Sequence, residues 1–240
     1  AITGYLFILP AIIGFSIFYL YPSIKGFSIS FTDWNLLSEP KNVAFANYSQ
    51  AIQDPKFWSA LSITLKYVLW NIPLQTLLAI LLAIGMDRLV KSMIIKGLLI
   101  VPYLLSGVLV GMIFLWLCDP LLGIINQWLA GTFIGKQGFF TSESQAIPTI
   151  AMINTWKHVG FNALLFYAGL QGIPRTVYEA ASIDGSSEIN TFWKITIPLL
   201  RPVTVFVLVT SVIGSFQIFD TVAVTTQGGP ADATKVLVYY

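Results

Sequence analysis

The chain has 240 residues, of which 56% are hydrophobic and only 10% are charged, and its mean hydropathy is +0.77. Soluble domains carry about 25% charged residues, so this composition excludes an ordinary soluble domain and indicates a protein that crosses a membrane several times. The net charge of +2 gives no basic footprint for nucleic acid, and the single cysteine, Cys118, excludes an intrachain disulfide and a cysteine-clustered metal site.

Five apolar stretches are long enough to cross a bilayer core, which takes about 20 helical residues. They predict an all-α polytopic membrane protein, a single transmembrane domain over 1–240 with spans at about 4–24, 60–86, 95–117, 147–170 and 199–223. The first stretch has no basic flank and no small-residue cleavage site, which favours a true span over a removed signal peptide. We expect both ends to be truncated, with a sixth span that opens at Lys235 and continues beyond Tyr240.

The basic residues of the loops predict which side of the membrane each loop faces. Two loops, 87–96 and 171–201, are the richest in basic residues, which are Arg88, Lys91, Lys96, Arg175, Lys194 and Arg201. Cytoplasmic loops carry the excess of Lys and Arg, so both are predicted to be cytoplasmic. The loops 25–59 and 118–146 then face outward.

A compact polar segment over about 174–197, called the elbow below, separates the fourth and fifth predicted spans. Thr176 and Glu179 have the spacing of a capping box, which predicts a short helix that runs to about Asp184. Gly185 then supplies the turn.

A second short helix is predicted to follow this turn until Pro198 interrupts it, so the segment forms a helix-turn-helix outside the membrane. Ala180 and Ala181 are predicted to leave one face of the first helix nearly flat, which permits close approach by another protein. From the spacing alone, docking and a purely structural role both stay open.

The fifth predicted span carries a polar face. Thr210, Gly214, Gln217 and Thr221 recur at intervals that place them on one side of a helix. A path for sugars needs hydroxyl-matching groups and aromatic surfaces. The predicted pathway residues are Thr210, Ser211, Gly214, Phe216, Gln217 and Asp220. Small and hydroxyl residues also serve helix packing in membranes, so that role stays open as well.

Other polar residues lie inside the predicted spans. Asn71 and Gln75 are four residues apart on one face, which predicts an interhelical hydrogen bond. His158, the only histidine, excludes a metal site with several histidines in this chain and is expected to turn into the bundle and pair with neighbours such as Asn154. For Lys157 the same inward pairing and a role in the pathway stay open.

The chain shows no nucleotide site. Residues 131–137 resemble a phosphate loop only superficially, since three residues separate the glycines and Gln137 follows the lysine. Active transport would therefore take its energy from a separate chain.

The elbow carries a resemblance to a known family. Glu179-Ala180-Ala181, Gly185 after three further residues, and then Ile195-x-Ile197-Pro198 resemble the EAA loop of permease subunits of binding-protein-dependent ABC importers. Within that group the chain resembles the carbohydrate type over nearly its whole length, and Gly228-Gly229-Pro230 points toward sugars and related polyols. Ser186, where the family more often has alanine, is a small departure.

The resemblance implies a permease subunit in a bacterial or archaeal inner membrane, which is not itself an enzyme and holds no metal or other cofactor. The residues that it implies for ATPase coupling are Glu179, Ala180, Ala181, Asp184 and Gly185. The implied partners are two ATPase subunits that bind ATP-Mg, a second permease, identical or related, and an external solute-binding protein. This last protein would dock on 25–59, 118–146 and 227–234. The charges of Asp184, Glu188, Lys194 and Arg201 would tune the ATPase contact.

A structural or assembly membrane protein without transport is one alternative, against which the polar face at 210–221 argues. Two further alternatives remain open at this point. One is a permease of the same class for a non-sugar solute such as a peptide or an amino acid. The other is a secondary transporter driven by an ion gradient, which typically places acidic residues at the membrane midplane. Asp220 lies toward the outer end of its predicted span, which argues against the second alternative.

Overall fold

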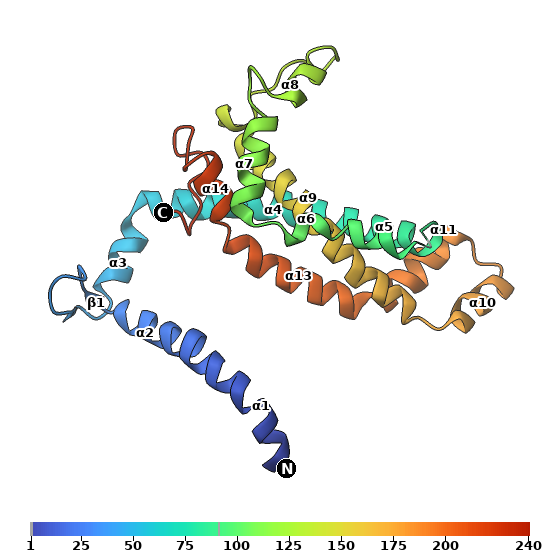
Figure 1. Ribbon diagram of the computed structural model, residues 1–240, viewed down its shortest axis with the longest axis horizontal. Helices are drawn as coiled ribbons and strands as arrows, with labels where there is room; N and C mark the ends of the chain where they lie inside the picture. Colours follow the sequence, from blue (N-terminus) through green and yellow to red (C-terminus); the bar gives the residue numbers. More distant parts are fainter. Residues whose placement is uncertain (1, 91) are drawn as a thin grey trace. The chain divides into compact units, whose positions relative to one another are not determined.

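A computed structural model describes residues 2–90 and 92–240, and these residues are mostly helical (Figure 1). Ala1 and Lys91, a member of the predicted basic loop 87–96, lie outside the described residues. The chain divides into two compact units, 1–58 and 59–240, which are treated separately.

The first unit opens with a long apolar helix. α1 (Ile2–Phe15) continues through a π-helical turn (Ser16–Leu20) into α2 (Tyr21–Ile29). Residues 32–42 then form a small antiparallel sheet, in which β1 (Thr32–Asp33) pairs with β2 (Lys41–Asn42), and α3 (Ala46–Gln53) follows. The predicted first span is thus part of a helix that is apolar as far as Ile29.

Three long helices form the body of the second unit. These are α4 (Pro55–Arg88), which begins in the first unit and continues through Pro73, α9 (Ala146–Gln171) and α13 (Arg201–Phe216). Figure 1 shows them as the elongated middle of the unit.

Shorter elements complete the second unit. They are α5 (Met93–Leu98), α6 (Val101–Leu104), α7 (Gly107–Leu117), α8 (Ile124–Leu129), a 3-10 turn (Phe139–Thr141), α10 (Arg175–Ile183), α11 (Glu188–Thr191), a π-helical turn (Phe192–Thr196), α12 (Ile197–Leu199) and α14 (Asp220–Thr225).

Among the described residues, three helices are long and apolar enough to cross a membrane, namely Tyr5–Ile29, Pro55–Arg88 and Arg201–Thr225. The predicted third span is not one straight helix, because Met93–Leu104 and Gly107–Leu117 meet at an angle of 92°. Leu105 is extended, and the Ser106 side chain caps the new helix by accepting a hydrogen bond from the backbone N–H of Leu109 at 3.1 Å. The pair counts as a fourth span only if both halves are taken together.

α9 agrees with the predicted fourth span in position and length, but it is not among the three helices that are long and apolar enough to cross a membrane. The polar side chains of Asn154, Lys157, His158 and Asn162 lie along it. Residues 235–240 form turns, so the predicted opening of a further span at Lys235 is not a helix in the structure.

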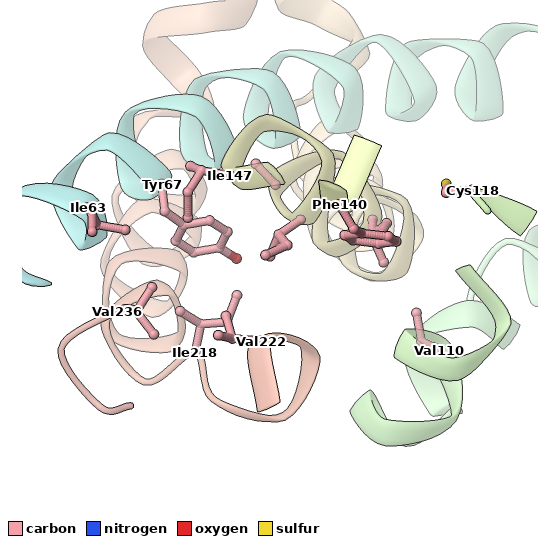
Figure 2. Close-up of a cluster of buried hydrophobic side chains, with 12 residues drawn as sticks. Ile63, Tyr67, Val110, Cys118, Phe140, Ile147, Ile218, Val222 and Val236 are labelled. Carbon is pink, nitrogen blue, oxygen red and sulfur yellow. The ribbon is translucent and has the colours of Figure 1, made fainter. Parts of the chain in front are cut away.

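Two apolar clusters form the core of the second unit, and both include α4. One contains Ile63 and Tyr67 of α4 with Ile150 of α9 and Val222 of α14 (Figure 2). The other contains Ala79, Ala83 and Met86 of α4, Ala163 and Phe166 of α9, and Val207 of α13. Residues four apart share a helix face, so the inward face of α4 is apolar at both ends. Asn71 and Gln75 lie on the same face between the two clusters and are buried.

We predict that Gly160→Ala destabilises the protein, because α9 passes very close to the turn between α5 and α6. A Cβ atom at Gly160 would overlap the carbonyl oxygen of Leu99. Overpacking of this kind costs about 1–3 kcal/mol. Thermal unfolding in detergent micelles should show the loss. Gly85→Ala is the control, since a Cβ there meets nothing within 4 Å; equal melting temperatures for the two variants would contradict the packing.

Candidate functional site

Asn71 joins the three long helices at one point. Its side-chain N–H donates to Ser215 Oγ of α13 at 3.0 Å, and its Oδ1 accepts from Asn154 Nδ2 at 3.3 Å and from Thr155 Oγ1 at 3.2 Å, both on α9. Asn71 is 1% exposed. A buried amide is costly unless it is hydrogen-bonded, so these contacts fix the relative positions of the helices.

Gln75 repeats the arrangement one turn further along α4. Its Nε2 donates to Ser211 Oγ of α13 at 3.3 Å. The interhelical hydrogen bonds predicted for Asn71 and Gln75 are therefore confirmed. Two amide atoms in this region, Gln75 Oε1 and Asn162 Nδ2, are buried and have no hydrogen-bond partner among the described residues.

A polar cavity of about 230 Å³ lies beside this layer, and we call it the amide cavity. It is lined by Asn71, Gln75, Tyr103, Asn154, His158, Phe161, Asn162, Thr210, Ser211, Gly214 and Ser215. The lining combines amides and hydroxyls with aromatic rings and contains no Asp, Glu, Lys or Arg.

The aromatic wall of the amide cavity comes from α6 and α9. Tyr103 stacks on Phe161 with ring centroids 4.3 Å apart and an interplanar angle of 8°, and His158 meets Tyr103 edge-on at 5.6 Å. His158 Nδ1 lies 2.9 Å from the backbone oxygen of Asn154. His158 therefore faces the cavity inside the bundle, as predicted, but its ring pairs with the backbone carbonyl of Asn154 and not with a polar side chain.

A smaller cavity of about 150 Å³ adjoins the amide cavity and shares Asn154 and Gly214 with it. Its lining differs in charge, since it includes both Lys157 and Asp220. Gly107 leaves room for Asp220, because a Cβ there would lie 2.9 Å from Asp220 Oδ2.

The predicted pathway residues divide between the two cavities. Thr210, Ser211 and Gly214 line the amide cavity, and Gly214, Gln217 and Asp220 line the smaller one. Phe216 lines neither. The face is not one continuous helix as predicted, because α13 ends at Phe216 and α14 begins at Asp220.

Tyr103 of α6 and Phe161 of α9 line the amide cavity but were not predicted from the sequence. The sequence shows that both residues are aromatic. The periodicity of a single helix does not indicate which aromatic rings on different helices come into contact. The bend between α6 and α7 lies next to Tyr103, and the hydrophobic periodicity of the sequence did not predict it either.

The elbow turns at Gly185, as predicted. Gly185 has φ +72°, its N–H donates to the Ser182 carbonyl at 3.1 Å, and the Ser186 N–H donates to the Ala181 carbonyl at 2.9 Å. These two bonds are the Schellman arrangement that ends α10. A left-handed residue is required at this position, and glycine adopts that conformation without strain.

The capping box predicted at Thr176 and Glu179 is wrong. α10 begins at Arg175, so Thr176 lies inside its first turn, and no side chain caps the helix at Pro174. The backbone N–H of Val177 instead donates to the Pro174 carbonyl at 3.1 Å.

The prediction that Ala180 and Ala181 form one flat exposed face is also wrong. Ala181 is buried, whereas Ala180 is exposed, because consecutive helical residues point about 100° apart. The exposed surface of α10 instead presents Glu179, Ala180 and Ile183.

Pro198 does not interrupt the second helix of the elbow. The π-helical turn at Phe192–Thr196 precedes it, with the Ile197 N–H donating to the Phe192 carbonyl, and the helix continues through α12. The wider turn accommodates a proline that cannot donate a backbone hydrogen bond.

The elbow contacts the end of α4 through charged groups. Arg88 Nη1 lies 2.8 Å from Glu188 Oε2. This hydrogen bond and the charge of Arg88 lower the pKa of the Glu188 carboxyl. Next to Arg88, Asp87 Oδ1 accepts a short hydrogen bond from Gln171 Nε2 at the end of α9. No cluster of three or more metal-ligating side chains occurs in residues 2–90 and 92–240.

Comparison with known proteins identifies the family. Residues 56–238 match the family described as "Binding-protein-dependent transport system inner membrane component". The chain belongs to this family. It is therefore a permease subunit of the inner membrane, and the resemblance found in the elbow is confirmed. Members of this family are not themselves enzymes.

The relatives of this permease act on different solutes. It is 36% identical to the arabinooligosaccharides transport system permease protein AraP of Bacillus subtilis (strain 168), over 98% of this chain and 76% of AraP. It is 33% identical to the sn-glycerol-3-phosphate transport system permease protein UgpA of Agrobacterium fabrum, over 99% of this chain and 82% of UgpA.

The fold of the permease is that of a solved transporter subunit. A crystal structure of a bacterial ABC transporter involved in the import of the acidic polysaccharide alginate matches with a TM-score of 0.81 at 23% identity. The match covers 98% of this chain and 81% of that chain. At this identity the likeness concerns the fold alone.

We predict that Asn71→Leu lowers the stability of the permease, because Asn154, Thr155 and Ser215 each lose a partner. An unsatisfied buried polar group costs about 1–3 kcal/mol. Thr210→Val is the control, since that exposed hydroxyl bonds only to carbonyls of its own helix. Thermal unfolding in micelles should therefore shift for Asn71→Leu and stay nearly constant for Thr210→Val. Equal shifts would show that the layer does not hold the helices together.

Proposed function

We propose that this permease translocates a sugar or sugar-like polyol in an ATP-driven ABC importer, and that the solute passes the amide cavity. The observation that carries the proposal is the lining of that cavity, which places amides and hydroxyls opposite a stacked aromatic pair in an apolar bundle. Such a lining matches a sugar, which has hydroxyls on its edges and apolar C–H groups on its faces.

The unpaired amide atoms support a hydroxylated solute. Gln75 and Asn162 line the cavity, and each leaves one buried polar atom without a partner. A hydroxyl both donates and accepts, so it can pair with either end of an amide. A carboxylate or phosphate only accepts and finds no cation among the residues of this lining, which favours a neutral sugar over an anionic one.

The drive for transport is proposed to come from separate ATPase subunits that bind ATP-Mg and receive the cytoplasmic elbow. Asp184 and Gly185 are exposed at the turn between α10 and α11, and Glu179 and Ala180 are exposed on α10 itself, which supports this role. Ala181 is buried and would stabilise the turn through its carbonyl, which accepts a hydrogen bond from the Ser186 N–H. A second permease, identical or related, would complete the membrane part, because one narrow bundle cannot enclose a solute path on all sides.

An external solute-binding protein is proposed to deliver the solute to the outward loops. In the second unit, the loop 118–146 is internally ordered. Asn126 Nδ2 donates to the Gln137 carbonyl at 2.9 Å, and the Gln137 N–H donates to Asn126 Oδ1 at 2.8 Å. A prearranged loop costs less entropy on docking. Segments 25–59 and 227–234 are proposed to take part in the same docking.

Uptake by the reconstituted importer tests the proposed function. The permease, copurified with its partner subunits, is placed in proteoliposomes and supplied with the binding protein and radiolabelled solutes. Vanadate-sensitive uptake of a neutral sugar is the expected result. Uptake of a peptide or amino acid, or uptake driven by an ion gradient without ATP, would instead support one of the alternatives.

The turn of the elbow gives a further prediction. Gly185→Val should strongly reduce solute-stimulated ATP hydrolysis, because a left-handed conformation costs an ordinary residue about 1–2 kcal/mol and a β-branched one more. Gly185→Asn is the matched control, since asparagine tolerates this conformation and should keep most of the activity. The assay is ATPase activity with and without loaded binding protein. Equal loss in both variants would contradict a role for the backbone turn.

The charge of the elbow can be tested in the same assay. Glu179→Lys should abolish solute-stimulated ATP hydrolysis, because it reverses the charge of an exposed residue proposed to lie against the ATPase. Normal transport by Glu179→Lys would contradict this placement.

A further inference from the structure

The elbow has little apolar packing to hold it against the bundle. Of residues 174–197, only Ala181 and Thr196 are buried. A cavity of about 360 Å³, called the elbow cavity here, lies between this segment and the ends of α4 and α9. It is lined by Ile84, Asp87, Arg88, Leu170, Tyr178, Ser182, Ser186, Glu188, Thr191, Phe192 and Thr196. Movement of the elbow relative to α4 is therefore opposed by few close apolar contacts.

The ion pair between Arg88 and Glu188 bridges the two sides of the elbow cavity. Arg88 is the last residue of α4, and Glu188 is the first residue of α11. Their charged atoms are 2.8 Å apart, which is the distance of a charge-assisted hydrogen bond. Since Arg88 lowers the pKa of the Glu188 carboxyl, the pair stays charged at neutral pH.

The internal bonds of the elbow make Glu188 part of one body with α10. Thr191 Oγ1 donates to Ser186 Oγ at 3.0 Å, and the Tyr178 hydroxyl lies 3.2 Å from Thr196 Oγ1. With the two backbone bonds around Gly185, these contacts tie α10 to the helix that starts at Glu188. A force on α10 therefore reaches Glu188 without an intervening flexible joint.

On the other side, α4 leads directly to the amide cavity. No proline interrupts it between Gln75 and Arg88, and these residues are about 20 Å apart along the helix axis. At the far end of this stretch the side-chain N–H of Gln75 donates to Ser211 Oγ. A rigid helix thus has the ion pair at one end and the cavity lining at the other.

We propose that Arg88 and Glu188 form a latch by which α4 follows the elbow, so that both act as positioning residues for transport. This inference rests on the proposed function, since it assumes that an ATPase moves the elbow. It also assigns Glu188 a partner within this chain, whereas the sequence suggested that its charge would tune the ATPase contact.

The weakness of the pair as a stabilising interaction makes the latch testable. The two side chains are 58% and 81% exposed, and ion pairs at such positions contribute little to folding. Variants at either position should therefore fold. Their defect should be uncoupling, in which ATP hydrolysis persists while solute uptake falls.

Charge exchange is the experiment. Arg88→Glu and Glu188→Arg, alone and combined, are reconstituted as the complete importer, and solute uptake and ATP hydrolysis are measured in the same vesicles. Each single variant should lower the solute imported per ATP about fivefold or more, the lower end of a typical coupling energy. The double variant should recover most of this ratio, and Arg88→Lys should keep it, because both preserve an attractive pair.

A distance measurement reports the latch independently of transport. Spin labels on the exposed residues Leu89 and Ile189 should move apart in each single variant, because like charges then face each other, and return in the double variant. Lack of ATP-driven uptake by the unmodified importer would refute the proposed function, while the label distances would still report the latch. Failure of the double variant to restore both the ratio and the distance would overturn the latch and place Glu188 in the ATPase contact.

Discussion

The buried amide layer of Asn71 and Gln75 is the constraint on which the rest of this permease depends. Both residues lie on the inward face of α4, between an apolar cluster around Tyr67 and a second around Ala83. Since burying an amide is costly unless it is hydrogen-bonded, the bonds of the layer to Asn154, Ser211 and Ser215 hold α9 and α13 at defined positions. The apolar clusters hold the bundle together, and the polar layer specifies its register.

The layer also explains where the helices are irregular. The bend between α6 and α7 and the break between α13 and α14 both adjoin the two polar cavities, through Tyr103, Gly107 and Phe219. Non-helical backbone at membrane depth is tolerated where it lines a cavity or is buried in protein. The permease thus has irregular backbone beside the proposed path, while the elbow at the end of the bundle provides the proposed connection to an external motor.

Periodic features were predictable from the sequence, and features that depend on contacts between helices were not. The long helices, the polar face of α13, the bond-forming role of Asn71 and the turn at Gly185 follow from apolar periodicity or from backbone preference. Three local features were not predictable, because the sequence around each is compatible with more than one backbone conformation. These are the bend at Leu105, the start of α10 at Arg175 and the continuation of the helix through Pro198. Two contacts join residues that are far apart in the sequence and share no sequence pattern. They are the stacking of Tyr103 on Phe161 and the ion pair between Arg88 and Glu188.

If the amide cavity lies on the solute path, a thiol placed in its wall should be protected by the transported sugar, and thiol labelling measures this. A cysteine at Thr210, in a Cys118→Ser background, is treated with a hydrophilic thiol reagent in the reconstituted importer. Val209→Cys is the control, since Val209 is exposed on the same helix and does not line the cavity. We expect Thr210→Cys to react with the reagent and to react more slowly when transported sugar is present. We expect Val209→Cys to react little, at a rate that sugar does not change. Equal reaction at both positions, unaffected by sugar, would contradict the placement of the amide cavity on the solute path.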